Sequence, residues 1–212
     1  SGSTSLFVAD NTLSANFSSN LSEGDLILIY QAQGATLSSA NTSAWGSVVS
    51  ENEAGNYEYV EVTGVVGGTE IALGCPLLHD YVATGKVQVI RVPRYSDLTI
   101  NAGGSVTCPS WDGSTGGIVV IESDSIIKVN GPIDVSGKGF RGGALDANST
   151  FSADWISINP DAGAEKGEGI GGNQTNYDAI GGRYCKAAPA NGGGGGGNWF
   201  AESINIGRMV IQ

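Results

Sequence analysis

Positive charge is scarce in this sequence, and that scarcity excludes several classes of partner. Ten Lys and Arg residues stand against 21 Asp and Glu residues, which gives a formal net charge of −11 at pH 7. A chain with this balance repels the phosphates of nucleic acids and the anionic lipids of membrane surfaces. We therefore expect no nucleic acid among its partners.

Long apolar segments are also missing. No apolar run reaches the roughly 20 residues that a membrane-spanning helix needs, so we expect no membrane insertion. Residues 1–8 lack the basic stretch and hydrophobic core of a signal peptide. Only 15% of the residues are charged, while Ser, Thr, Asn and Gly are abundant, which favours an extracellular, cell-surface location. The strand-like pattern of residues 203–212 leads us to expect a natural chain that continues past Gln212.

Cysteine and histidine are too few and too scattered for a recognisable metal site. The three cysteines form no CxxC pair, and the only histidine, His79, has no zinc-site spacing with them. Cys75 and Cys108 both lie beside proline at predicted turns. Two interpretations stay open: a Cys75–Cys108 disulfide with Cys185 left over as a free thiol or an intermolecular link, or small buried hydrophobic residues.

β-Strand patterns dominate residues 1–136. Residues 26–30 are continuously apolar, which indicates a strand buried on both faces, whereas residues 57–62 alternate and should have one face in water. Further strand patterns follow at residues 69–73, 86–92, 98–100, 117–121, 125–129 and 132–135. Short strands at this spacing favour successive rungs of a β-helix slightly over the edges of a sandwich.

The last of these strands predict a shared interior. Ile127 and Val129, then Ile133 and Val135, alternate with polar or small neighbours. Stacked turns would place these side chains one after another in a common core, although no strict repeat length is visible.

The composition changes near Gly137. The chain has 34 glycines, and they are concentrated after this point, with an uninterrupted run at residues 192–197. A flexible linker is the ordinary interpretation of such a segment, but a solvated linker has no reason to carry aromatic residues. This segment carries Phe140, Phe151, Trp155, Tyr177, Tyr184, Trp199 and Phe200.

We therefore predict that the glycine-rich segment packs instead of acting as a linker. Glycine runs can form polyproline-II-type helices, in which the backbone groups bond to neighbouring segments. The expected fold is all-β, with a β-sandwich or short β-helix module at residues 1–136. A packed, polyglycine-II-like region that ends in a strand follows at residues 137–212.

No combination of residues points to catalysis. The pattern GxGxxG occurs at residues 137–142 and again at 167–172, but no βαβ unit accompanies either copy, so we assign no nucleotide site. Asp residues lie mostly in turn-like contexts, where their backbone hydrogen bonds explain them. A lone His79 does not make a triad. We predict no catalytic residues; a β-helix glycosidase or lyase is the enzymatic alternative.

Calcium is the one cofactor that the composition allows. Asp and Asn side chains and glycine-loop carbonyls are hard oxygen donors, and the chain is acidic. The sequence contains no EF-hand loop and no RTX nonapeptide, and surface turns explain the same residues. We therefore assign no metal ligands and no cofactor.

Aromatic residues are the remaining candidates for binding. Trp and Tyr rings stack on sugars and anchor protein interfaces. We predict that Trp111, Trp155, Trp199 and Tyr177 bind a glycan or another surface ligand. A role in the core or in glycine packing is the competing interpretation for at least half of the tryptophans.

Ordered patches of characteristic sequence cover most of the chain. They are residues 24–35 (GDLILIYQAQGA), 55–59 (GNYEY), 87–96 (VQVIRVPRYS), 111–117 (WDGSTGG), 131–143 (GPIDVSGKGFRGG), 167–170 (GEGI) and the glycine run. Together they resemble the N-terminal glycine-rich region of very large surface proteins of Bacteroidetes and myxobacteria. Many of those proteins are type IX secretion cargo and proposed adhesins. The resemblance implies a cell-surface location more directly than it implies an activity.

The sequence thus leads to a non-enzymatic, extracellular surface module that mediates adhesion to a surface, a glycan or a neighbouring cell. The first alternative is a structural protomer of an extracellular filament or sheath, in which a terminal strand or glycine face pairs with other copies of the chain. The second alternative is a β-helix carbohydrate-active enzyme.

Overall fold

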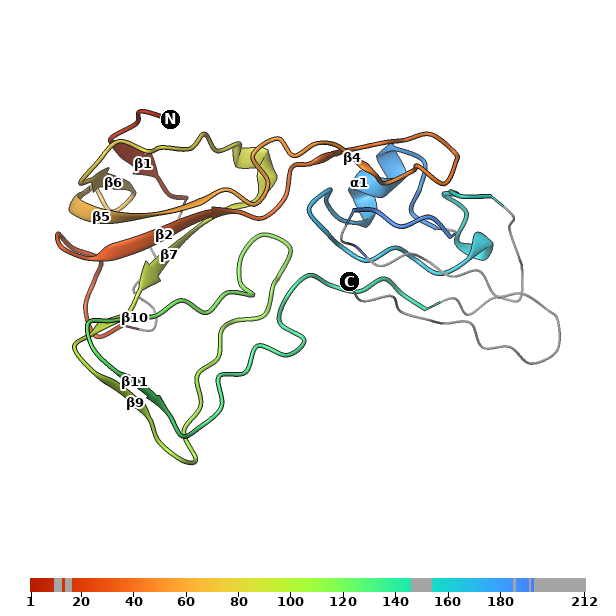
Figure 1. Ribbon diagram of the computed structural model, residues 1–212. Helices are drawn as coiled ribbons and strands as arrows, with labels where there is room; N and C mark the ends of the chain where they lie inside the picture. Colours follow the sequence, from red (N-terminus) through yellow and green to blue (C-terminus); the bar gives the residue numbers. More distant parts are fainter. Residues whose placement is uncertain (10–12, 14–16, 146–153, 185, 191, 193–212) are drawn as a thin grey trace. The chain divides into compact units, whose positions relative to one another are not determined.

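The computed structural model has an all-β fold, as the sequence predicts, and divides into two compact units (Figure 1). It describes residues 1–9, 13, 17–145, 154–184, 186–190 and 192. Unit 1 consists of Ser1–Ala32 and Gly55–Gly139, and unit 2 of Gln33–Ala54 and Phe140–Gln212. The boundary between Gly139 and Phe140 lies three residues beyond the predicted one after residue 136. The transfer of Gln33–Ala54 to unit 2 has no counterpart in the predicted domains.

Unit 1 is built on an antiparallel sheet of five strands in the order β1-β6-β5-β2-β7. β2 lies between β5 and β7 and pairs with both of them. Its side chains are buried or half-buried on both faces of the sheet, which explains its continuously apolar sequence. The strands are β1 (Ser5–Phe7), β2 (Leu26–Gln31), β5 (Tyr57–Val66), β6 (Glu70–Leu73) and β7 (Val87–Val92).

β5 and β6 form the hairpin that the sequence predicts at this point. The turn between them contains Gly67 at φ 59° and Gly68 at φ 79°. Only glycine adopts these left-handed conformations without steric cost, so the glycine pair fixes where the chain reverses.

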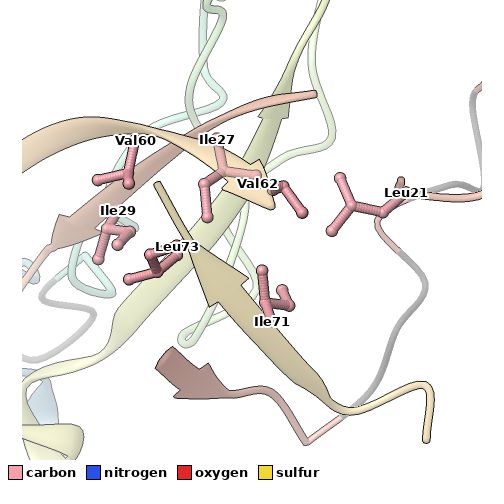
Figure 2. Close-up of a cluster of buried hydrophobic side chains, with 7 residues drawn as sticks. All are labelled: Leu21, Ile27, Ile29, Val60, Val62, Ile71 and Leu73. Carbon is pink, nitrogen blue, oxygen red and sulfur yellow. The ribbon is translucent and has the colours of Figure 1, made fainter. Parts of the chain in front are cut away.

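One face of the sheet carries the main hydrophobic core (Figure 2). Burial of each large aliphatic side chain contributes about 1.5–3 kcal/mol relative to exposure. Val8, Leu77 and Tyr81, from segments outside the sheet, pack against the same cluster and help to cover it. The cluster itself consists of Leu21, Ile27, Ile29, Val60, Val62, Ile71 and Leu73.

After β7 the chain makes two similar turns, which stack on each other in parallel. We call residues 94–111 coil 1 and residues 122–138 coil 2. β8 (Arg94–Tyr95) pairs with β10 (Glu122–Ser123), and β9 (Leu98–Ile100) pairs with β11 (Ile127–Val129). Figure 1 shows β9 and β11 side by side. A parallel bridge between Val106 and Ile133 extends the match, which is the arrangement of consecutive β-helix rungs.

The stacking exposes an internal repeat. Residues 98–101 (LTIN) match residues 127–130 (IKVN), and residues 104–108 (GSVTC) match residues 131–135 (GPIDV). Coil 1 contains two extra residues, Ala102 and Gly103, between the two blocks. This difference removes any fixed period, which is why the repeat is not visible in the sequence.

Unit 2 has little regular structure. Its described elements are β3 (Thr36–Leu37), β4 (Val48–Ser50), a 3-10 turn at Pro160–Ala162 and the short helix α1 (Gln174–Ala179). Trp45 and Tyr177 form the centre of its core, with Ala35, Leu37 and Ala187. Most of the glycine run at residues 192–197 lies outside the described residues, so its polyglycine-II packing stays a prediction. Within the described part of the chain, no helix has the length and hydrophobicity to cross a bilayer.

Candidate functional site

The outer face of the five-stranded sheet, opposite the core, presents two tyrosines to solvent. The alternation of β5 turns Glu58 and Val60 inwards and leaves Tyr57 and Tyr59 outside, 59% and 49% exposed. Their rings meet edge to face, with centroids 6.3 Å apart and planes at 86°. This is a favourable geometry for an aromatic pair, so each ring restricts the orientation of the other.

A shallow hollow of about 340 Å³ lies beside Tyr59. Part of its floor is formed by Leu26 of β2 and Val92 of β7, which are cross-strand neighbours. This volume lies at the lower end of the range of small-ligand sites, which is about 300–1,000 Å³. Its lining consists of Leu26, Tyr59, Val92, Val120, Ile121 and Glu122.

The rim of the hollow carries a small charged network. Arg94 donates from Nε to Oε2 of Glu122 over 2.5 Å, and from Nη1 to Oε1 of Glu61 over 3.1 Å. The hydrogen bond to Glu61, followed by the one to Glu122, raises the pKa of Arg94. All three side chains are well exposed, and exposed ion pairs contribute little to stability. They are therefore free to exchange hydrogen bonds with a ligand.

A buried glutamine holds the covering segment against this face. Gln88 of β7 accepts a hydrogen bond from the backbone N–H of Gly116 over 2.8 Å and donates one to the Gly116 carbonyl over 3.4 Å. Gln88 is a cross-strand neighbour of Tyr30 in β2. This anchor fixes the start of residues 116–122, the segment that supplies the hollow with Val120, Ile121 and Glu122.

The structure places most of the sequence-predicted binding residues elsewhere. Trp111 is buried in coil 1, and Tyr177 is buried in the core of unit 2, where its hydroxyl donates to the Gly172 carbonyl over 2.8 Å. Both rings are packed inside the fold, and ligand binding by them stays a prediction. Trp155 is partly exposed, with Nζ of Lys186 4.4 Å from its ring centroid. Trp199 lies outside the described residues.

The two cysteines predicted to pair are free thiols in this structure. Cys75 is exposed just after β6, whereas Cys108 is buried in coil 1 and matches Val135 of the repeat. The alternative of a small buried hydrophobic residue therefore describes Cys108, and the Cys75–Cys108 disulfide is not formed. Cys185 lies outside the described residues.

The described part of the chain contains no recognisable metal site. There, no group of three or more His, Cys, Asp or Glu side chains converges as an ion site. Asp112 instead accepts hydrogen bonds from the backbone N–H groups of Thr115 and Ser114, which lower the pKa of its carboxyl. Such turns are the ordinary use of Asp in loops. The absence of a cofactor stays a prediction, with calcium as the one cofactor that the composition allows.

Sequence reasoning missed the tyrosine pair although its signal is present. The alternation of residues 57–62 predicts a strand with one face in water, and Tyr57 and Tyr59 fall on that face. Two aromatic residues on the wet face of a strand are a stronger sign of binding than tryptophans in glycine-rich loops, because the strand holds both rings on one surface.

Comparisons of the chain with protein-family models, curated proteins and solved structures give no match. The resemblance to glycine-rich regions of surface proteins is therefore carried by the sequence patches alone.

Proposed function

We propose that this chain is a non-enzymatic extracellular adhesion module that binds glycans on the outer face of its five-stranded sheet. The observation that supports the proposal is the exposed pair of Tyr57 and Tyr59 beside a hollow with an apolar floor and a charged rim. Sugar rings have an apolar C–H face, which packs on aromatic rings, and a periphery of hydroxyl groups, which exchange hydrogen bonds with charged side chains. The outer face offers both kinds of contact.

Each part of the site has a distinct role in this proposal. Tyr59 forms the wall on which a sugar ring stacks, and Tyr57 extends the aromatic surface toward a neighbouring sugar. Leu26 and Val92 exclude water beneath the ring. The oxygens of Glu61 and Glu122 and the guanidinium of Arg94 lie at the edge, where they meet hydroxyl groups.

The arrangement of the acidic residues supports binding over hydrolysis. Glycosidases use two carboxyl groups with different roles, one of which donates a proton to the leaving oxygen. Here Glu61 and Glu122 both accept hydrogen bonds from the same side chain, Arg94. A single guanidinium bonds both carboxylates, and this arrangement does not set one apart as a proton donor and the other as a nucleophile or base.

The test is a glycan array probed with the purified chain, followed by calorimetric titration of the best ligand. We expect Tyr59→Ala to raise the dissociation constant roughly 30-fold, the equivalent of losing about 2 kcal/mol at a central aromatic contact. Phe7→Ala is the matched control, because Phe7 is an exposed aromatic residue on β1, at the far edge of the same sheet.

Two results would count against the proposal. If no glycan on the array binds, adhesion through this face is wrong. If Tyr59→Ala and Phe7→Ala bind the ligand equally well, the outer face is not the site, and loss of binding in Trp155→Ala would then move the site to unit 2.

A further inference from the structure

Coil 2 exposes a row of four apolar side chains, and two of them have buried counterparts in coil 1. Val129 is 54% exposed and Val135 41%, whereas their counterparts Ile100 and Cys108 are 5% and 6% exposed. Ile127 and Ile133, which belong to the same row, are also exposed. Coil 2 is therefore the last turn of the stack, yet it exposes apolar side chains of the kind that an interior turn would bury.

The backbone of coil 2 has a free edge in the same place. The N–H of Leu98 donates to the carbonyl of Ile126 over 3.1 Å, and the N–H of Asn130 donates to the carbonyl of Ile100 over 2.8 Å. In a parallel ladder this pattern directs the N–H and C=O groups of Ile127 and Val129 to the opposite edge. Among the described residues, β11 has a ladder with β9 alone.

We propose that a second copy of this chain covers this edge, so that two copies associate through their coil 2 surfaces. The contact would lie on the edge of coil 2 opposite the one that pairs with coil 1. Coil 1 shows that coil 2 pairs through its other edge with a turn that has the repeated pattern of residues 98–101 and 104–108. Coil 2 of another copy carries the same pattern and presents it to solvent.

The charges of coil 2 allow such an association. The whole chain has a net charge of −11, which disfavours contact between most of its surfaces. Coil 2 after β10 instead carries Asp124 and Asp134 together with Lys128 and Lys138, which balance each other. An exposed lysine on an edge strand discourages indiscriminate pairing, so a partner that supplies a carboxylate to Lys128 is favoured. A second coil 2 supplies one.

We expect the association to stop at two copies. Ile100 and Cys108 are already buried, so coil 1 offers no matching apolar row for a head-to-tail contact. The same surface must then meet itself, which is the isologous contact of a two-fold dimer. Identical edge strands related by a two-fold axis run antiparallel and can exchange backbone hydrogen bonds.

Sedimentation velocity across a concentration series tests the proposal. We expect the full chain to show a reversible monomer–dimer equilibrium, and Val129→Lys to raise the dimer dissociation constant at least tenfold. Val66→Lys is the matched control, since Val66 is an exposed valine (62%) at the end of β5, outside the coils. It should dimerise like the unmodified chain.

A second variant separates loss of contact from loss of fold. Lys128→Glu changes only an exposed side chain, and it should weaken the dimer while circular dichroism stays unchanged, because the edge then carries excess negative charge. The proposal is wrong if the unmodified chain is monomeric throughout the series, or if Val129→Lys and Val66→Lys dimerise equally. Growth into filaments of unlimited length would overturn the closed pairing.

Discussion

Gly131 of coil 2 lies against the backbone of Gly104 of coil 1, so closely that no side chain fits between them. A Cβ atom on Gly131 would lie 2.2 Å from the carbonyl oxygen of Gly104 and 2.6 Å from that of Asn101. Both neighbours are backbone atoms, so no rotamer change can relieve the overlap. The glycine therefore sets the distance between the two coils.

We expect Gly131→Ala to lower the free energy of unfolding by about 1–3 kcal/mol, since the coils must move apart to accept the methyl group. Gly139→Ala is the control, because no atom lies within 4 Å of the Cβ position there. Denaturant unfolding followed by circular dichroism measures both. Equal unfolding midpoints for the two variants would show that the coils are not closely packed at Gly131.

The central sheet could be predicted because its burial follows from short-range patterns. The continuous apolar run of β2 and the alternation of β5 report how many faces of each strand are covered. The coil repeat could not be recognised from the sequence because Ala102 and Gly103 lengthen one turn and not the other. The stacking depends on matched blocks, not on a fixed period, and only the structure aligns the blocks.

The sequence did not predict which segments form unit 2, and it did not predict the hollow. The reason differs from that for the coil repeat. Trp45 packs against Tyr177, far along the chain, so nothing near Trp45 in the sequence marks its segment as part of unit 2. The hollow likewise needs residues 116–122 on the outer face, and the contact between Gln88 and Gly116 is one of those that anchor this segment. Side-chain periodicity carries no information on either contact.

Gly182 also has no room for a side chain. Its close neighbour is the side chain of Trp45, whereas the neighbours of Gly131 are backbone atoms. A Cβ on Gly182 would lie 2.1 Å from Cζ2 of Trp45. The indole cannot yield easily, since it is buried, its Nε1 donates to the Ile180 carbonyl over 3.4 Å, and its ring centroid lies 6.0 Å from that of Tyr177.

We expect Gly182→Ala to destabilise unit 2 and to shift the tryptophan fluorescence to longer wavelength, as Trp45 is displaced toward water. Gly142→Ala, where no atom lies within 4 Å of the Cβ position, should leave the spectrum unchanged. Emission spectra of the two variants under native conditions measure the effect. An unshifted spectrum for Gly182→Ala would mean that the packing around Trp45 adapts to the methyl group.

Arg141 and Glu168 form the most extensively bonded ion pair that we find in unit 2. The Glu168 carboxylate accepts hydrogen bonds from the backbone N–H, Nε and Nη2 of Arg141, and the N–H of Glu168 donates to the Arg141 carbonyl over 2.8 Å. The glutamate side chain is fully buried, whereas that of the arginine is half exposed.

Removal of the arginine side chain takes hydrogen bonds and a positive charge from a buried carboxylate. We expect Arg141→Ala to cost about 2–3 kcal/mol of unfolding free energy, less than for a fully buried pair because water reaches the arginine. Arg94→Ala, which breaks only exposed pairs, should leave the midpoint of thermal unfolding nearly unchanged. If the two variants melt together, the Arg141–Glu168 pair contributes no more than a surface pair.

Tyr177 should make the protein sensitive to alkaline pH. Burial, and then the negative charge of Glu168, raise the pKa of Tyr177 above its ordinary value of 10.0. Between the ordinary and the raised pKa, the unfolded chain releases a proton that the folded chain retains. The contribution of Tyr177 to stability is therefore complete below about pH 10 and decreases as the pH rises further.

Tyr177→Phe separates this effect from the other tyrosines, such as Tyr81, whose pKa is also raised by burial and by Glu58. The variant loses the hydrogen bond to Gly172, so we expect it to be about 1 kcal/mol less stable than the unmodified chain at neutral pH. Because phenylalanine has no proton to release, the difference should shrink above about pH 10. Urea unfolding at a series of pH values measures it, with Tyr57→Phe as an exposed control. A constant difference across the series would mean that Tyr177 ionises in the folded protein as readily as in the unfolded chain.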